Sequence, residues 1–128
     1  MSPPKGRRRV LLAIPAIAYA SLILFLSSRP GADVPSLGIP LGDKFLHVIE
    51  YFVLGLLVLL PVSDAGWRHR LLAIALGVAL AAIDESFQTT VPGRLGDVAD
   101  FIVDVGGLLA AVVFDATVRP WRFTARPS

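Results

Sequence analysis

Four long apolar stretches, separated by short polar segments, constrain this chain more than any other feature of its sequence. They occupy residues 10–26, 43–60, 71–87 and 98–118. At a rise of about 1.5 Å per residue, each can cross a hydrocarbon core of roughly 30 Å as a helix, alone or with its flanks. With 55% hydrophobic residues and a mean hydropathy of +0.70, the chain is too apolar for a soluble domain. Most of its surface must therefore face a lipid bilayer.

We accordingly predict an all-α fold, an integral membrane bundle of four transmembrane helices that forms a single domain over residues 1–128. The helices are expected at about 10–27, 43–60, 71–88 and 98–118. The first stretch follows a basic cluster, as in a signal peptide, but it is long and the exit Ser27-Ser28-Arg29 is a poor cleavage site. We expect it to remain as an anchor, with Pro15 tolerated inside it.

Charge and cysteine content exclude several functional classes. The twelve basic residues lie between the apolar stretches and at the termini, so they form no single patch for nucleic acid. We expect no nucleic-acid partner. The absence of cysteine excludes disulfides, a thiolate zinc site and a cysteine nucleophile.

The basic residues also predict the orientation of the bundle. If the amino terminus is inside, the residues on the cytoplasmic side are Lys5, Arg7, Arg8, Arg9, Arg68, Arg70, Arg119, Arg122 and Arg126. Only Arg29, Lys44 and Arg94 then lie outside, in agreement with the positive-inside rule. Trp67 and Trp121 would both reach the cytoplasmic interface, where indole rings favour the headgroup level. We therefore expect cytoplasmic amino and carboxyl termini.

Polar residues concentrate at the opposite, outer end of three predicted helices. These stripes comprise Asp43, Lys44, His47, Glu50 and Tyr51 in the second helix, Asp84, Glu85 and Gln88 in the third, and Asp97, Asp100 and Asp104 at the fourth. The spacings of three and four residues place each stripe on one helix face. An ionised group at the centre of a membrane helix costs about 2.5 to 3.5 kcal/mol. The three stripes should therefore face one another.

Further local contacts follow from spacing. The turn Val91-Pro92-Gly93-Arg94 is expected to fold Arg94 over the carboxylates, where a bidentate bond is feasible. Asp115 and Arg119 are four residues apart and are expected to form a local ion pair. The glycine pair at 106–107 permits close contact between helices.

Several of these residues also have a purely structural interpretation. For Lys44, Asp33 and Asp97, snorkelling to headgroups or pairing with a neighbour is the favoured reading. His47 is either a packing histidine or a proton-handling residue, since Asp43 lies one turn before it and Glu50 one turn after it. Tyr51 can equally belong to the core.

These motifs resemble those of the VanZ-like family of small bacterial membrane proteins. The matching residues are Asp43-Lys44 with His47, Tyr51 and Gly55, then Asp84-Glu85 with Gln88, then Gly93-Arg94, then Asp100 with Gly107. Two departures stand out: Asp104 occupies a position where the family usually has asparagine, and Glu50 is an unusual polar residue beside Tyr51. The resemblance implies a multi-pass protein of the bacterial inner membrane. The family's namesake is associated with resistance to the glycopeptide antibiotic teicoplanin.

Two functions are compatible with the polar cluster. The first is an enzyme that acts on a cell-envelope or lipid-linked substrate at the outer leaflet. In this enzyme, His47 or Glu85 would be the general acid or base. Asp43 would orient the imidazole, and Arg94 would bind an anionic group. The second is a non-catalytic module that binds a cell-wall precursor, a lipid headgroup or an antibiotic. A proton or ion pathway is disfavoured, because only Asp115 continues the acidic residues into the cytoplasmic half.

The candidate site follows from these assignments. Its catalytic residues are Asp43, His47, Asp84 and Glu85, and its binding residues are Lys44, Tyr51, Gln88, Arg94, Asp100 and Asp104. One imidazole among carboxylates suits manganese, magnesium or zinc, but the spacing matches no specific metal motif, so the metal and any cofactor stay undetermined. Small residues at positions 77, 79, 81 and 82 can pack within or between chains, which leaves a homo-oligomer open.

Overall fold

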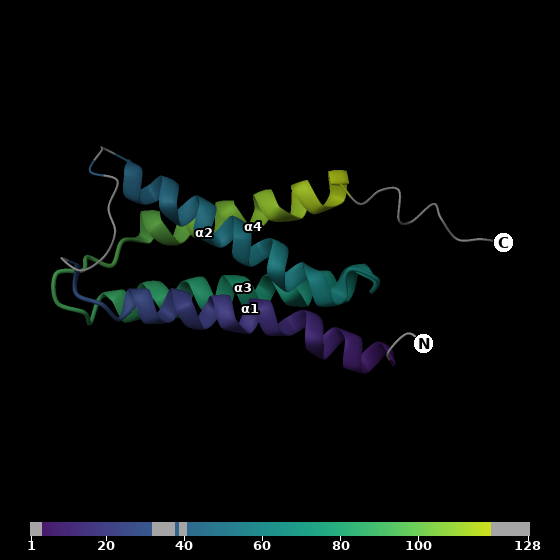
Figure 1. Cartoon of the computed structure of the whole chain (residues 1–128). Coiled ribbons are helices and arrows are strands. Elements are labelled where there is room, and N and C mark those ends of the chain that lie inside the picture. Colours follow the sequence, from purple (N-terminus) through teal and green to yellow (C-terminus); the bar gives the residue numbers. More distant parts are fainter. Residues whose placement is uncertain (1–3, 32–37, 39–40, 119–128) are drawn as a thin grey trace.

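The structure, a computed structural model, describes residues 4–31, 38 and 41–118, and within them the regular secondary structure is all helical, with no strand. The elements are α1 (Lys5–Ser27), α2 (Gly42–Leu59), a 3₁₀ turn η2 (Leu60–Val62), α3 (Trp67–Gln88) and α4 (Val98–Val118) (Figure 1). Four helices, with α2 counted through η2, are long and apolar enough to cross a membrane. The prediction of an all-α bundle with four candidate membrane spans is confirmed.

Two helices begin earlier than hydropathy predicted. α1 starts at Lys5 and α3 at Trp67, although the apolar stretches start at residues 10 and 71. Lysine and arginine are good helix formers, so the backbone hydrogen bonds continue through charged residues that hydropathy excludes. α1 also runs without interruption through Pro15.

The start of α1 and the end of α4 lie at the same end of the bundle (Figure 1). At this end, Arg8 and Arg9 each lie 3.5 Å from Asp64, in the connection between α2 and α3. Arg70 donates to the buried carboxylate of Asp115 and thereby joins α3 to α4. The predicted partner of Asp115, Arg119, lies outside the described residues.

All four helices contribute to one buried apolar cluster. It consists of Ile23 from α1, Tyr51 and Leu54 from α2, Ala81 from α3 and Leu108 from α4. Each of these side chains is at most 1% exposed. The small residues of α3 lie in two different environments. Gly77 and Ala81 are buried in the interior of the bundle, whereas Ala79 and Ala82 are exposed on its surface.

α2 and α4 form the closest helix pair. A Cβ added at Gly107 would lie 2.5 Å from the Val48 carbonyl oxygen, and one added at Gly55 would lie 2.5 Å from the Ala111 Cβ. Each glycine therefore lets the facing helix approach. Of the glycine pair 106–107, which was expected to permit close contact between helices, only Gly107 does so. A Cβ at Gly106 would meet nothing within 4 Å. This approach brings the polar faces of α2 and α4 together.

Candidate functional site

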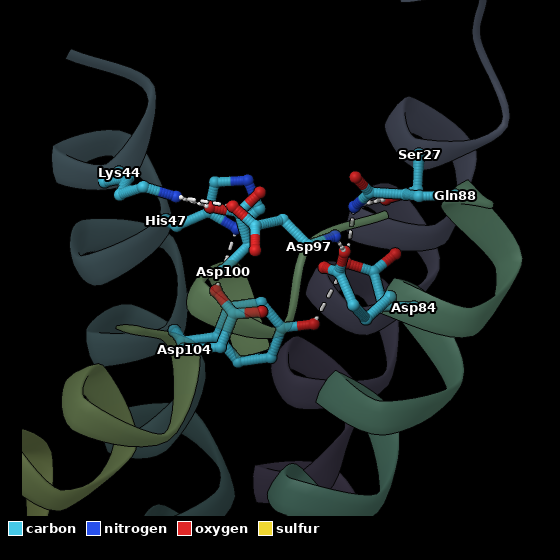
Figure 2. Close-up of polar contacts among 10 residues, drawn as sticks. Ser27, Lys44, His47, Asp84, Gln88, Asp97, Asp100 and Asp104 are labelled. Carbon is cyan, nitrogen blue, oxygen red and sulfur yellow. Dashed lines mark hydrogen bonds and ion pairs between the residues drawn. The ribbon is translucent and has the colours of Figure 1, made fainter. Parts of the chain in front are cut away.

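The polar stripes meet at the end of the bundle where α1 and α3 finish and α2 and α4 begin (Figure 2). The side chains converge in the space between the α2–α4 pair and the α1–α3 pair. The residues linked there by hydrogen bonds or ion pairs are Ser27, Lys44, His47, Tyr51, Asp84, Glu85, Gln88, Asp97, Asp100 and Asp104. The structure thus brings together the stripes that the sequence placed on three helices.

Two residues of α2, His47 and Lys44, contact carboxylates on α4 or just before it. The His47 Nδ1 atom lies 2.8 Å from Oδ1 of Asp104, whose side chain is fully buried. One turn nearer the helix ends, the Lys44 ammonium lies 2.6 Å from Asp100 and 3.3 Å from Asp97. The expectation that Asp43 orients the imidazole is wrong, because Asp104 on the facing helix is the carboxylate bonded to it. Asp43 instead lines the cleft described below, on the first turn of α2.

A second network joins α3 to α2 and α1. The Tyr51 hydroxyl donates to Oδ2 of Asp84 at 3.1 Å, and the Gln88 amide donates to the same oxygen at 3.3 Å. Gln88 also donates to the Ser27 hydroxyl at 3.4 Å. Tyr51, Asp84, Gln88 and Ser27 are all buried, so Tyr51 serves both the core and the polar cluster.

Glu85 and Asp97 organise the start of α4. Glu85 accepts a hydrogen bond from the backbone amide of Asp97, and the Asp97 carboxylate accepts one from the Ala99 amide at 2.9 Å. The second bond is typical of a helix N-cap. Together with Lys44, it holds the pKa of Asp97 below its usual 3.8. Asp97 therefore has the structural role favoured by its sequence context.

Among the described residues, Arg94 binds no carboxylate, contrary to the expected bidentate bond. Its guanidinium donates to the carbonyl oxygens of Leu26 at 2.8 Å and Arg29 at 3.4 Å, where α1 ends. The turn before it forms as predicted, with the Arg94 amide bonded to the Val91 carbonyl at 3.1 Å. Gly93 has a φ of +75°, which a type II turn requires at its third position. Because the carbonyls at a helix end lack intrahelical donors, they bind Arg94 readily.

A cleft of about 550 Å³ opens beside these networks, between α1 and α2. Its polar lining includes Ser27, Asp43, His47, Glu50, Gln88, Arg94 and Asp100, and its apolar lining includes Tyr19, Leu26, Leu46, Ile49 and Leu95. Behind the lining, where Asp104 bonds to His47 and Asp84 to Gln88, three buried carboxylate oxygens have no hydrogen-bond partner within the described residues: Oδ1 of Asp84, Oε2 of Glu85 and Oδ2 of Asp104. Buried polar atoms are normally paired, so these oxygens indicate a site for a proton, water or ligand.

The candidate site drawn from the sequence left out three cleft residues with hydrogen-bonding side chains, Tyr19, Ser27 and Glu50. Ser27 was read as a helix end and Tyr19 as part of an apolar run, whereas Glu50 was placed in the polar stripe of the second helix but treated as a departure from the family pattern. Only Glu50 carried a usable signal, since it shares a helix face with His47. In the described part of the chain, no three His, Asp or Glu side chains are grouped to hold a metal ion.

Comparison with known proteins gives a single result. The sequence model of the VanZ/LLP1 family matches residues 10–118, from Val10 within α1 to the end of α4. No curated protein and no solved structure shows a significant match. The match covers most of the 128 residues, agrees with the motifs around His47, Asp84 and Arg94, and accounts for the four apolar helices of a multi-pass membrane protein. The chain therefore belongs to the VanZ/LLP1 family.

Proposed function

We propose that this chain is a protein of the bacterial inner membrane that binds a cell-envelope or lipid-linked ligand in the cleft between α1 and α2, and acts on it by proton transfer. The cleft faces the outer leaflet in this proposal, and both termini are cytoplasmic. Support for this orientation comes from the basic residues near the start of α1 and the start of α3, which lie at the end of the bundle opposite to the cleft. A link to glycopeptide resistance belongs to the same proposal.

The contact between His47 and Asp104 is the observation that carries the catalytic part. His47 lines the cleft, and its Nδ1 lies 2.8 Å from a carboxylate with no exposed surface. A carboxylate in this position fixes the ring orientation and the tautomer, so the other ring nitrogen is available to take or give a proton. We assign His47 as the general acid or base and Asp104 as the residue that positions it.

A non-catalytic binding module is the second candidate, and the bonds of Glu85 and Arg94 favour it. Both residues were expected to act on the ligand, but Glu85 accepts from the backbone at the start of α4 and Arg94 donates to the backbone at the end of α1. Much of the polar cluster thus stabilises the fold. On this reading, recognition in the cleft needs no proton transfer.

Complementation of a deletion strain separates the two candidates. We would compare the wild type with His47→Asn and Asp104→Asn, using Asp64→Asn as a control at the opposite end of the bundle, and follow lipids and cell-wall precursors by mass spectrometry. If His47 transfers a proton, the precursor that accumulates in the deletion strain also accumulates with His47→Asn at normal membrane levels of the protein. Full restoration by His47→Asn would refute catalysis and leave the binding module.

The orientation is tested separately with fusions. A fluorescent protein that folds only in the cytoplasm should fluoresce at the carboxyl terminus. A periplasmic carboxyl terminus would place the cleft in the inner leaflet and contradict the proposed site.

A further inference from the structure

We propose that the cleft selects an amphipathic ligand with a primary ammonium headgroup, which enters from the bilayer between α1 and α2. This inference rests on the proposed function and names the ligand class of the same site. It is carried by the depth of the cleft, its mixed lining and the excess of carboxylates around it.

The cleft reaches from the polar end into the membrane-spanning part of the bundle. On α1 its lining runs from Ser27 to Tyr19, and on α2 from Asp43 to Glu50. At about 1.5 Å per residue, these intervals correspond to roughly 10 to 12 Å along each helix. This depth matches a lipid headgroup together with the first carbons of its chains.

One side of the lining is continuous with the lipid-facing surface. Ile49, within the candidate span of α2, is 44% exposed and lines the cleft together with Leu46 and Leu26. Leu95, in the connection between α3 and α4, also lines the cleft and is 90% exposed. An apolar chain can therefore extend from the cleft into the hydrocarbon while the headgroup remains inside. A small soluble amine gains nothing from these contacts, since it has no apolar chain to bury.

The polar part of the cleft favours a cation. Glu50 lines it and makes no hydrogen bond or ion pair within the described residues. The groups within its electrostatic reach include His47 and Arg94 as well as the carboxylates of Asp84 and Asp104, so carboxylates outnumber the one permanent cation. Asp84, Asp104 and Glu85 do not line the cleft, but each keeps one buried oxygen without a partner in the described part of the chain and adds negative charge behind the lining. A primary ammonium carries positive charge and donates several hydrogen bonds, so it satisfies the Glu50 carboxylate.

Three other ligand classes fit less well. An anionic headgroup would lie among the carboxylates of Asp43, Glu50 and Asp100, with Arg94 as the one permanently charged cation in the described lining. A quaternary ammonium has the charge but no hydrogen to donate, so it would leave the Glu50 carboxylate unpaired. A bare metal ion finds no group of three ligands among the described residues.

Binding of defined lipids to the full chain tests the inference. We would purify the protein in a neutral detergent and measure binding of short-chain phosphatidylethanolamine, phosphatidylcholine and phosphatidylglycerol by native mass spectrometry, with free ethanolamine as the soluble probe. Glu50→Gln is the informative variant, because the Glu50 side chain loses no hydrogen bond to any described residue. Asp64→Asn, at the other end of the bundle, is the matched control for loss of one carboxylate.

We expect phosphatidylethanolamine to bind roughly ten-fold or more tightly than phosphatidylcholine, because a hydrogen bond to a charged group contributes about that much. Glu50→Gln should abolish this preference and Asp64→Asn should keep it. Equal binding of the ethanolamine and choline lipids, an unchanged preference in Glu50→Gln, or equally tight binding of free ethanolamine would each overturn the inference. Preferential binding of phosphatidylglycerol would overturn the ammonium class while leaving a lipid-binding cleft, whereas binding of none of the lipids would count against the proposed function as well.

Discussion

Replacing Gly107 by alanine should separate α2 from α4 and thereby disrupt the polar cluster. The new Cβ would lie 2.5 Å from the Val48 carbonyl oxygen and 2.9 Å from the Phe52 amide nitrogen, both of them backbone atoms. No side-chain rotation relieves such contacts. To reach an ordinary contact distance of 3.4 Å from Val48, the two helices must move apart by about 0.9 Å.

The expected cost is about 1 to 3 kcal/mol in the free energy of unfolding, the usual range for overpacking. The same displacement would stretch the 2.8 Å contact between His47 and Asp104, which spans these two helices. Unfolding of the purified protein by heat or by sodium dodecyl sulfate in mixed micelles measures the stability. Complementation of the deletion strain reports the effect on the site.

Gly106→Ala is the matched control, since a Cβ there would meet nothing within 4 Å. It should leave stability unchanged or raise it by up to about 1 kcal/mol, because alanine favours the helix over glycine. If Gly107→Ala proves as stable as Gly106→Ala, the close approach of α2 and α4 is incorrect. The geometry derived for the His47 pair would then be incorrect too.

Two further predictions concern the edges of the cluster. Tyr51→Phe removes a buried donor from Asp84 and should lower the free energy of unfolding by about 1 to 3 kcal/mol. Tyr19→Phe is the control and should leave it unchanged, because the Tyr19 hydroxyl makes no hydrogen bond within the described residues. Equal stability of the two variants in denaturant-dependent unfolding would contradict the contact between Tyr51 and Asp84. The pKa of Asp97 is held below 3.8 by its bonds to the α4 backbone and to the α2 lysine, so its stabilisation is complete above about pH 4 and declines as the pH falls through that lowered pKa. The Asp97→Asn variant keeps the helix cap but loses the ion pair with Lys44. Its melting temperature should therefore depend less on pH, between pH 5 and pH 2, than that of the wild type. An identical pH profile would refute the stabilising role of the Asp97 carboxylate.

The sequence by itself determined the number, type and approximate bounds of the helices. Apolar stretches of this length leave few alternatives, because a hydrocarbon environment requires every backbone group to bond within its own segment. The spacing of residues such as His47 and Asp84 also placed the polar faces at one end. Helix starts were the weak point, since Lys5–Arg9 and Trp67–Arg70 are helical in spite of their polarity.

Only the tertiary structure decided which polar groups pair. Local spacing favoured Asp43 as the partner of His47, but the closeness of α4 at Gly107 gives that role to Asp104. Likewise, backbone carbonyls at the end of α1 bind Arg94, and nothing near Arg94 in the sequence indicates them. Partners on the same helix follow from its periodicity, whereas partners on different helices depend on how closely the backbones approach, which a single sequence does not encode locally.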